Sequence, residues 1–408
     1  MKYQSVYEAE TSIEELALLA KTAGAKVCGQ FVVRLQNINP KSFIGAGKIS
    51  EIKEFIEKKQ EETGEEFDIV IFDEELSGVQ LRNLEEMFGL PVIDRTQLIL
   101  HIFAMRARTQ EGMLEVELAQ LEYLMPRLIG LGKVLSRTGG GIGTRGPGET
   151  KLEADRRKIR TRISKVKEDL ENIKQHRSLH RRLRSEFPFP QVSLVGYTNA
   201  GKSTLLNSLS GAEVLAKDQL FSTLDTTTKK IKLPGSALEI LMTDTVGFIN
   251  KLPHKLVMSF RATLEEVNHA DLLLHVVDAS NYDYKEQIEA VNIVLKEIEA
   301  QDKPAVLVFN KIDAGDVIDT SLYQNVSFVK ISARHYRGFE ELYAEIEKHF
   351  VKFIGEYHLK VPFTEGKLIS FLRGYSRILD EKQLENDIEF KIKMYKRYEN
   401  MIANYLVK

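Results

Sequence analysis

The chain is poor in cysteine and tryptophan: its 408 residues include one cysteine, Cys28, and no tryptophan. A single cysteine excludes disulfide bonds within the chain, and such usage is typical of a reducing compartment. The first ten residues, MKYQSVYEAE, contain no apolar core of the kind that a secretory signal needs. No uninterrupted apolar run approaches the roughly 18 residues of a membrane span. We therefore expect a cytoplasmic protein with no membrane span.

The chain also lacks a large net charge, because 57 Lys and Arg residues face 59 Asp and Glu residues, for a net charge of −2. This balance argues against a protein that coats nucleic acid indiscriminately. The charge is unevenly distributed, however, because residues 127–184 hold 17 Lys or Arg and 6 Asp or Glu, a net of +11. At this length we expect about two to four domains.

The most informative pattern that is present is G-x-x-x-x-G-K-S-T at residues 196–204, directly after the apolar run 192–195. Between a strand and a helix, this pattern lets backbone N–H groups surround a phosphate. Lys202 can reach the β- and γ-phosphates, and the Ser203 hydroxyl can hold Mg²⁺. The residues of this loop expected at the nucleotide are Gly196, Tyr197, Thr198, Asn199, Ala200, Gly201, Lys202, Ser203 and Thr204.

Three further motifs follow, each at the end of a predicted apolar strand. Strand 238–242 leads to D-x-x-G, in which the Asp can hold the Mg²⁺ shell and the Gly N–H can meet a γ-phosphate. Strand 305–309 leads to N-K-x-D, whose carboxylate can accept hydrogen bonds from N1–H and the amine of guanine. Strand 327–331 leads to Ser-Ala-Arg, whose backbone can contact the guanine carbonyl. In this order they predict a guanine-nucleotide-binding domain that uses Asp244, Thr245, Val246, Gly247, Asn310, Lys311, Ile312, Asp313, Ser332, Ala333 and Arg334.

The segment between the phosphate loop and D-x-x-G contains four threonines within residues 221–228. One of them should close over Mg²⁺ and the γ-phosphate when GTP is bound, which makes the segment a switch. Spacing does not choose among the four, and a polar edge strand is the alternative. The candidates for nucleotide contact are Phe221, Ser222, Thr223, Leu224 and Asp225.

Two positions bear on the rate of hydrolysis. Many GTPases place a Gln after D-x-x-G to orient the attacking water, but this chain has Phe248 there. We therefore expect slow hydrolysis by the isolated protein, or the use of another group. Asn199 resembles the Asn of GTPases that hold K⁺ against the phosphates, and a simple turn-favouring Asn is the other interpretation.

Residues 1–106 are predicted to form a small α/β domain, with strands at 26–33 and 67–72 and a helix at 76–88. Its GAGK sequence at residues 45–48 departs twice from a phosphate loop, so we interpret it as a strand-to-helix turn.

Residues 107–184 carry two heptad stripes of apolar residues, which predict an antiparallel hairpin of two long helices. Between them, residues 139–148 contain six glycines, so this stretch should be an exposed tip. The concentration of basic residues beside the tip favours backbone contact with RNA over a merely solvated face.

Pro-rich residues 185–190 should link the hairpin to a nucleotide-binding domain at 191–355. Residues 356–408 should form a small α+β unit, with a strand at 388–394 between helices at 368–375 and 395–406. The fold class is therefore multidomain α/β: a P-loop GTPase domain with a mixed, mostly parallel sheet, preceded by a small α/β domain with a helical hairpin.

Together these motifs resemble the HflX family of GTPases, and residues 94–108, 116–121 and 146–157 are the least generic part of that resemblance. It implies that Thr223 is the switch threonine, so Mg²⁺ would be held by Ser203 and Thr223. Lys202, Thr223 and Gly247 would act in hydrolysis of GTP. It also implies binding to the large ribosomal subunit through the hairpin and the splitting or rescue of stalled or idle ribosomes under stress. We further expect a monomer whose hydrolysis of GTP is stimulated by ribosomes.

Two other functions are compatible with a GTPase bearing a basic hairpin. The hairpin could dock a protein partner, which would make the chain a signalling switch. It could instead lie on anionic lipid, but the apolar stripes then have no free face to offer the membrane.

Overall fold

The computed structural model describes residues 6–128, 147–184, 189–211, 220–221, 223–224, 226–234, 239–251 and 261–407. The chain divides into two compact units. The first comprises Met1–Ile173, Gln219–Phe221 and Lys251–Phe260, and the second comprises Lys174–Asp218, Ser222–Asn250 and Arg261–Lys408. No helix among the described residues combines the length and the apolarity needed to cross a membrane.

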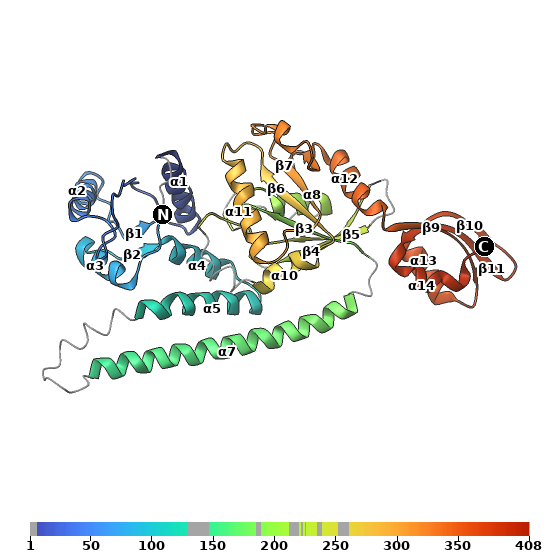
Figure 1. Ribbon diagram of the computed structural model, residues 1–408, viewed down its shortest axis with the longest axis horizontal. Helices are drawn as coiled ribbons and strands as arrows, with labels where there is room; N and C mark the ends of the chain where they lie inside the picture. Colours follow the sequence, from blue (N-terminus) through green and yellow to red (C-terminus); the bar gives the residue numbers. More distant parts are fainter. Residues whose placement is uncertain are drawn as a thin grey trace. The chain divides into compact units, whose positions relative to one another are not determined.

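The N-terminal part of the first unit is a small α/β domain whose two strands pair in parallel, with Val70 opposite Val92. Leu84 and Phe88 belong to an apolar core that also includes Val92. In chain order its elements are α1 (Val6–Thr22), α2 (Ala46–Thr63), β1 (Val70–Phe72), α3 (Gly78–Phe88), β2 (Val92–Asp94) and α4 (Arg95–Arg106) (Figure 1).

The strand predicted at residues 26–33 is wrong, because this segment has no regular structure. Phe31 and Val33 in this segment are partly covered by packing and not by strand pairing. The Phe31 ring meets Phe55 edge-on with 5.1 Å between centroids, and Val33 packs against the same core. The strand predicted at residues 67–72 is confirmed only for its last three residues, which are β1.

Caps set the helix boundaries in this domain. Ser77 caps α3 in a reciprocal capping box with Gln80. The Asp94 carboxylate caps α4 by accepting from the Gln97 N–H at 2.9 Å. Gly45 occupies the cap position of α2, so the GAGK sequence begins a helix. The strand that we predicted before it is absent from the described residues.

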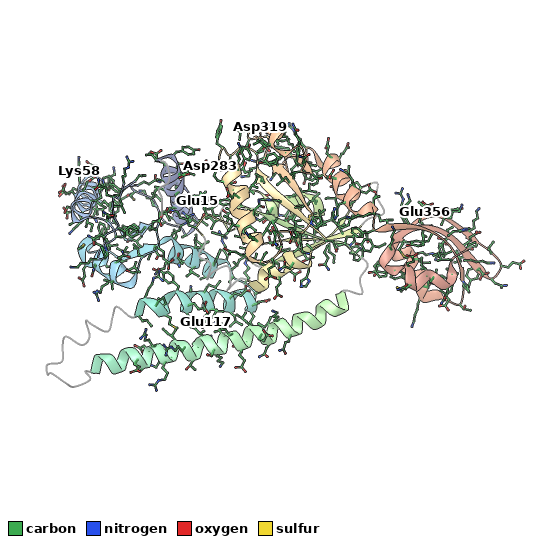
Figure 2. The ribbon with its side chains drawn as sticks, in the orientation of Figure 1. Glu15, Lys58, Glu117, Asp283, Asp319 and Glu356 are labelled. Atoms are coloured by element: carbon green, nitrogen blue, oxygen red, sulfur yellow. The ribbon has the colours of Figure 1, made fainter. Side chains whose placement is uncertain are left out.

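The two predicted long helices are present as α5 (Gln110–Arg127) and α7 (Pro147–Arg184), which run side by side in opposite directions (Figure 1). Glu117 on α5 accepts two hydrogen bonds from the Arg162 guanidinium, at 2.5 and 2.7 Å (Figure 2). Lys167 pairs with Glu122 at 2.8 Å. Most of the predicted glycine-rich tip, residues 139–146, lies outside the described residues.

Helix α5 packs on the N-terminal domain as well as on α7. Its most buried side chains include Val116, Ala119 and Tyr123, and α5 contacts both α3 and α4. On α7, Val166 is fully buried. Val116, Ala119 and Tyr123 lie outside the predicted heptad stripe, so α5 buries a further face on the N-terminal domain in addition to its ion pairs with α7.

The nucleotide-binding domain is built on a six-stranded sheet in the order β4-β5-β3-β6-β7-β8. Only β4 is antiparallel to its neighbour, so the expected mixed, mostly parallel sheet is confirmed. Its elements are β3 (Gln191–Gly196), α8 (Lys202–Ser210), β4 (Thr227–Lys232), β5 (Glu239–Asp244), α10 (Arg261–His269), β6 (Leu272–Asp278), α11 (Tyr284–Glu297), β7 (Ala305–Asn310), a 3₁₀ turn (Thr320–Tyr323), β8 (Phe328–Lys330) and α12 (Phe339–Val351).

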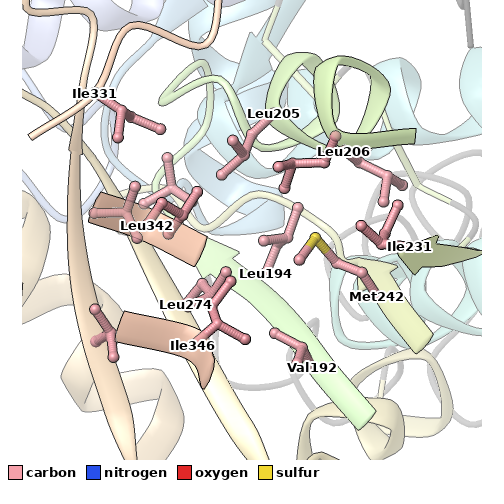
Figure 3. Close-up of a cluster of buried hydrophobic side chains, with 14 of the residues drawn as sticks. Val192, Leu194, Leu205, Leu206, Ile231, Met242, Leu274, Ile331, Leu342 and Ile346 are labelled. Carbon is pink, nitrogen blue, oxygen red and sulfur yellow. The ribbon is translucent and has the colours of Figure 1, made fainter. Parts of the chain in front are cut away.

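One apolar core holds the phosphate-loop strand and the helix after it. Leu194 on β3 and Leu205 on α8 are fully buried in this core, together with Leu274 on β6 (Figure 3). Burial of side chains of this size stabilises the fold by about 1.5–3 kcal/mol each. The loop between β3 and α8 is therefore held at both ends by side chains that are buried in this core.

The C-terminal unit is a three-stranded antiparallel sheet in the order β10-β11-β9. The predicted strand at 388–394 and helix at 368–375 are confirmed, whereas the predicted helix at 395–406 is a series of short helical turns. We missed β9, although its apolar residues alternate, and β10, whose mostly charged edge sequence carries little strand signal. The elements are β9 (Ile354–Pro362), α13 (Gly366–Tyr375), β10 (Arg377–Gln383), β11 (Asp387–Tyr395), α14 (Glu399–Ile402) and 3₁₀ turns at Lys396–Tyr398 and Ala403–Tyr405.

Candidate nucleotide-binding site

The phosphate loop connects β3 to the N-terminus of α8, as its sequence predicts. Three of its residues have left-handed backbones: Gly196 (φ 152°), Asn199 (φ 62°) and Gly201 (φ 97°). A Cβ on Gly196 would lie 2.2 Å from the Val276 carbonyl oxygen, and one on Gly201 would lie 2.3 Å from the Asn310 amide nitrogen. Both glycines are therefore required by space as well as by conformation.

Lys202 is buried at the start of α8, with 6% of its surface exposed. Its ammonium donates to the carbonyl oxygens of Gly196 and Tyr197, both at 2.9 Å. Burial lowers the pKa of Lys202 to about 8, and the nearby Asp244 carboxylate only partly opposes this shift. The cation thus lies over the loop, in a place where an added phosphate would favour its charged form.

Three oxygen-bearing side chains meet beside the loop. The Ser203 hydroxyl donates to the Asp244 carboxylate at 2.6 Å and lies 2.7 Å from the Thr223 hydroxyl. Asp244 is 2% exposed, burial raises the pKa of its carboxyl group, and its Oδ1 atom has no hydrogen-bond partner among the described residues. Hydroxyl and carboxylate oxygens are the donors that Mg²⁺ prefers, so this set fits a Mg²⁺ site.

The same contacts distinguish between the four threonines. Thr223 is the one that reaches Ser203, whereas Thr227 and Thr228 belong to the edge strand β4. Thr228 shares a 2.9 Å hydrogen bond with Thr243 on β5. The alternative interpretation as an edge strand therefore describes the end of the segment, and the switch interpretation fits its start.

The D-x-x-G segment runs along the phosphate loop. The Phe248 carbonyl accepts from the Thr198 N–H at 2.7 Å, and the Phe248 N–H donates to the Gly196 carbonyl at 3.2 Å. A Cβ on Gly247 would lie 2.8 Å from the Thr198 methyl and 3.1 Å from the Lys202 ammonium. The Phe248 side chain is 2% exposed, so it packs in the protein interior and offers nothing to a water molecule.

The residues expected to read the base are tied to the phosphate loop. The Asn310 amide donates to the Ala200 carbonyl and accepts from the Ala333 N–H, both at 2.9 Å. The Asp313 carboxylate accepts from the Ser332 hydroxyl at 2.6 Å, and this hydrogen bond lowers its pKa. The carboxylate is therefore ionised and oriented at neutral pH, as recognition of guanine requires.

The other predicted residues have varied surroundings. Phe221 belongs to the first unit, where its ring packs on Phe103 with 4.6 Å between centroids. The Thr245 hydroxyl donates to the Leu194 carbonyl at 2.6 Å, which gives it a structural partner. Ser222 and Asp225 lie outside the described residues. Leu224 and Val246 are buried, Thr204 and Ile312 are partly exposed, and Arg334 is exposed.

Sequence reasoning missed two contacts at this site. The Tyr197 hydroxyl accepts from the Asn250 N–H at 2.7 Å, and the Lys311 ammonium pairs with Asp278 at 2.7 Å. Asp278 ends β6, the strand between the phosphate-loop strand and the N-K-x-D strand. The position of Asp278 at the carboxyl end of a strand could have indicated that it lies near the site. The Tyr197 contact depends on a turn that no sequence pattern predicts.

These features define a P-loop protein whose site is arranged for a guanine nucleotide. Family models match three stretches: "GTP-binding GTPase N-terminal" at residues 10–104, "GTP-binding GTPase Middle Region" at 106–184 and "50S ribosome-binding GTPase" at 191–311. The chain belongs to the HflX family of GTPases.

Two relatives in sequence agree with this assignment. GTPase HflX of Caldanaerobacter subterraneus subsp. tengcongensis is 46% identical over 400 residues, which cover 98% of this chain and 91% of that protein. GTPase HflX of Escherichia coli (strain K12) is 43% identical over 380 residues, 92% of this chain and 87% of that protein. A GTP-binding protein from Sulfolobus solfataricus, solved in complex with GDP, is 26% identical with a TM-score of 0.45, covering 84% of this chain and 97% of that one.

Proposed function

We propose that this chain hydrolyses GTP, associates with the large ribosomal subunit, and dissociates or rescues stalled or idle ribosomes under stress. One set of hydrogen bonds supports the nucleotide part of the proposal. Asn310 bonds to the phosphate loop and to the segment after β8, and Ser332 in that segment bonds to the Asp313 carboxylate. The groups that would recognise the base are therefore fixed beside those that would bind the phosphates. The ribosomal part is supported by membership of a family whose nucleotide-binding domain is described as ribosome-binding.

The residues at the phosphate end have distinct tasks in this proposal. Lys202 neutralises charge that develops as water attacks the γ-phosphate, and the Gly247 N–H holds a γ-phosphate oxygen. Ser203 and Thr223 would hold Mg²⁺, with Asp244 behind them, and the ion would neutralise the β- and γ-phosphate oxygens. Because Phe248 is buried, hydrolysis by the free protein is slow, and the ribosome accelerates it by ordering the site.

A second cation is part of the proposal. Asn199 has a left-handed backbone at φ 62°, which satisfies the interpretation as a turn residue. We propose that its side chain also helps to hold K⁺ against the phosphates. Hydrolysis would then be faster in potassium chloride than in sodium chloride at equal ionic strength.

Helix α7 supplies the surface for rRNA. Arg157, Arg160 and Lys165 are exposed and have no ion-pair partner among the described side chains, whereas Arg162 and Lys167 are paired with α5. Free cationic side chains on one long helix suit contact with the phosphate backbone. The protein would act as a cytoplasmic monomer.

Co-sedimentation with large ribosomal subunits tests this function. Binding should be strong with a non-hydrolysable GTP analogue and weak with GDP, and equal pelleting in both states would contradict the switch. The variant R157E/R160E/K165E should weaken binding and reduce the salt slope of log K by about 2–3, given roughly 0.7–0.9 per phosphate contact.

A matched control is K367E/K382E/K391E, which reverses three exposed lysines in the C-terminal unit. It should leave ribosome binding within about twofold. Equal loss in both variants would indicate a general charge effect and not an interface on α7. Full binding by the α7 variant would favour the alternative in which the hairpin docks a protein partner.

A further inference from the structure

The third residue of the phosphate loop, Thr198, has a hydroxyl group that the fold leaves without a partner. Its side chain is 5% exposed, and its Oγ1 atom has no hydrogen-bond partner among the described residues. Leaving a buried hydroxyl unbonded costs free energy. A group of this kind in a binding site points to something that it meets only when the site is in use.

The surroundings of Thr198 show which part of the nucleotide it faces. The Thr198 N–H is fixed by the Phe248 carbonyl at 2.7 Å. Its methyl group lies 2.8 Å from the position of a Cβ on Gly247, and the same position is 3.1 Å from the Lys202 ammonium. The Thr198 side chain therefore lies beside Gly247 and Lys202, the two groups assigned to the γ-phosphate, with its methyl group toward them and its hydroxyl on the same Cβ atom.

The neighbouring side chains do not provide a free polar group that could orient the attacking water. The Phe248 side chain is 2% exposed and apolar, so it cannot orient water. The Thr245 hydroxyl is bonded to the Leu194 carbonyl, and the Ser203 hydroxyl is bonded to Asp244. The Thr198 hydroxyl has both a proton and lone pairs available, which is the capacity that the carboxamide of a water-orienting Gln provides.

We propose that Thr198 is a catalytic residue whose hydroxyl contacts the attacking water at the γ-phosphate, in the role that Phe248 cannot fill. This inference rests on the proposed hydrolysis of GTP. The water oxygen forms a bond to the γ-phosphorus as the bond to the β–γ bridging oxygen breaks, and that electron pair leaves on GDP. The water proton passes to the released phosphate or to solvent. Thr198 positions the water and is itself unchanged.

The test compares T198V, which keeps the shape of the side chain and removes the hydroxyl, with T198S, which keeps the hydroxyl. In the full-length protein, single-turnover hydrolysis of GTP by T198V should fall by about tenfold to hundredfold. Its affinity for a non-hydrolysable fluorescent GTP analogue should stay within about threefold of wild type, because the loop backbone makes the ground-state contacts. T198S should retain most of the rate.

T228V is the matched control, since it removes a threonine hydroxyl whose partner is Thr243 on β5. It should leave the rate of hydrolysis unchanged. Hydrolysis by T198V at the wild-type rate would overturn the proposal. So would an equal loss of rate in T198V and T198S, or a parallel loss of analogue affinity, because either result indicates a structural role. If wild type binds the analogue but never hydrolyses GTP, it is the proposed function that fails, before Thr198 is tested.

Discussion

The nucleotide site and the outer face of α7 use charged residues in opposite ways. At the nucleotide site the charged residues Lys202 and Asp244 are at most 6% exposed, and each has a defined partner. On α7 the cations Arg157, Arg160 and Lys165 stand in solvent. A buried charge needs partners that the fold itself holds in place, because an unpaired buried charge costs free energy. An exposed charge is solvated by water until a partner binds, so the position of its side chain in the complex depends on that partner.

This difference predicts how the two regions respond to mutation. Removal of a buried charge at the nucleotide site should have a large effect that is insensitive to salt. Changes on α7 should be graded and sensitive to salt. Substitutions at Lys202 and Asp313 test the expectation for the nucleotide site, and co-sedimentation with ribosomal subunits tests the expectation for α7.

The largest effect should follow from K202M, which keeps the length of the side chain and removes its charge. Hydrolysis of GTP should fall by about a thousandfold, since the ammonium acts on charge that develops in the transition state. Single-turnover assays at saturating nucleotide measure this loss. K303M is the control, because the half-buried Lys303 also donates to a backbone carbonyl, that of Ala270 at 2.7 Å. A loss below tenfold in K202M would show that the Lys202 ammonium contributes little to stabilising the transition state.

Base selection should change next most strongly. In D313N the side chain presents an amide donor where guanine also presents donors, so affinity for GDP should fall by about a hundredfold or more. Affinity for xanthosine diphosphate should rise, because its second carbonyl oxygen accepts the amide proton. Fluorescence titration with both nucleotides measures this change in base preference. Retention of full GDP affinity would contradict the assignment of Asp313 as the group that reads the base.

The sequence could predict which motifs meet at the phosphate loop because each motif ends a strand. The parallel order of β5, β3, β6, β7 and β8 brings the carboxyl ends together, so the motif order alone was enough to place Asp244 and Asn310 beside the loop. Thr223 was selected by resemblance and not by spacing. The unbonded Thr198 hydroxyl was not foreseeable, because it depends on the path of a segment 50 residues further along the chain.

Other parts of the fold were harder to predict for physical reasons. The segment at 26–33 has a strand-like run of residues, but it pairs with no strand among the described residues, and Phe31 is covered by Phe55 instead. β10 pairs with β11 through its backbone while its side chains are mostly exposed, so its sequence carries no apolar period. Periodicity reports burial on a face and does not report which element provides it.

Nucleotide affinity should also depend on pH. In the free protein burial lowers the pKa of Lys202 to about 8, and bound phosphates favour the charged form, which raises it. Binding therefore takes up a proton above pH 8, and affinity should fall by up to about tenfold per pH unit there, with little change below pH 7. Titrations with fluorescent GDP at pH 7, 8 and 9 measure the slope. The slope should vanish in K202M, and a slope that persists there would belong to another group.

The smallest effect should come from F248Q, although this variant restores the residue that many GTPases use. Phe248 is 2% exposed and its backbone is bonded to Gly196 and Thr198, so a Gln at this position enters an apolar environment and does not reach the water. We expect the basal rate to rise by less than about threefold, while unfolding becomes easier by about 1–3 kcal/mol because a buried amide lacks partners. Single-turnover hydrolysis with and without ribosomes, together with thermal unfolding, measures both effects. A rise above tenfold without ribosomes would mean that the segment around position 248 moves outward when GTP binds. The nucleotide site would then not be fixed in advance, and this difference between it and the exposed face of α7 would be lost.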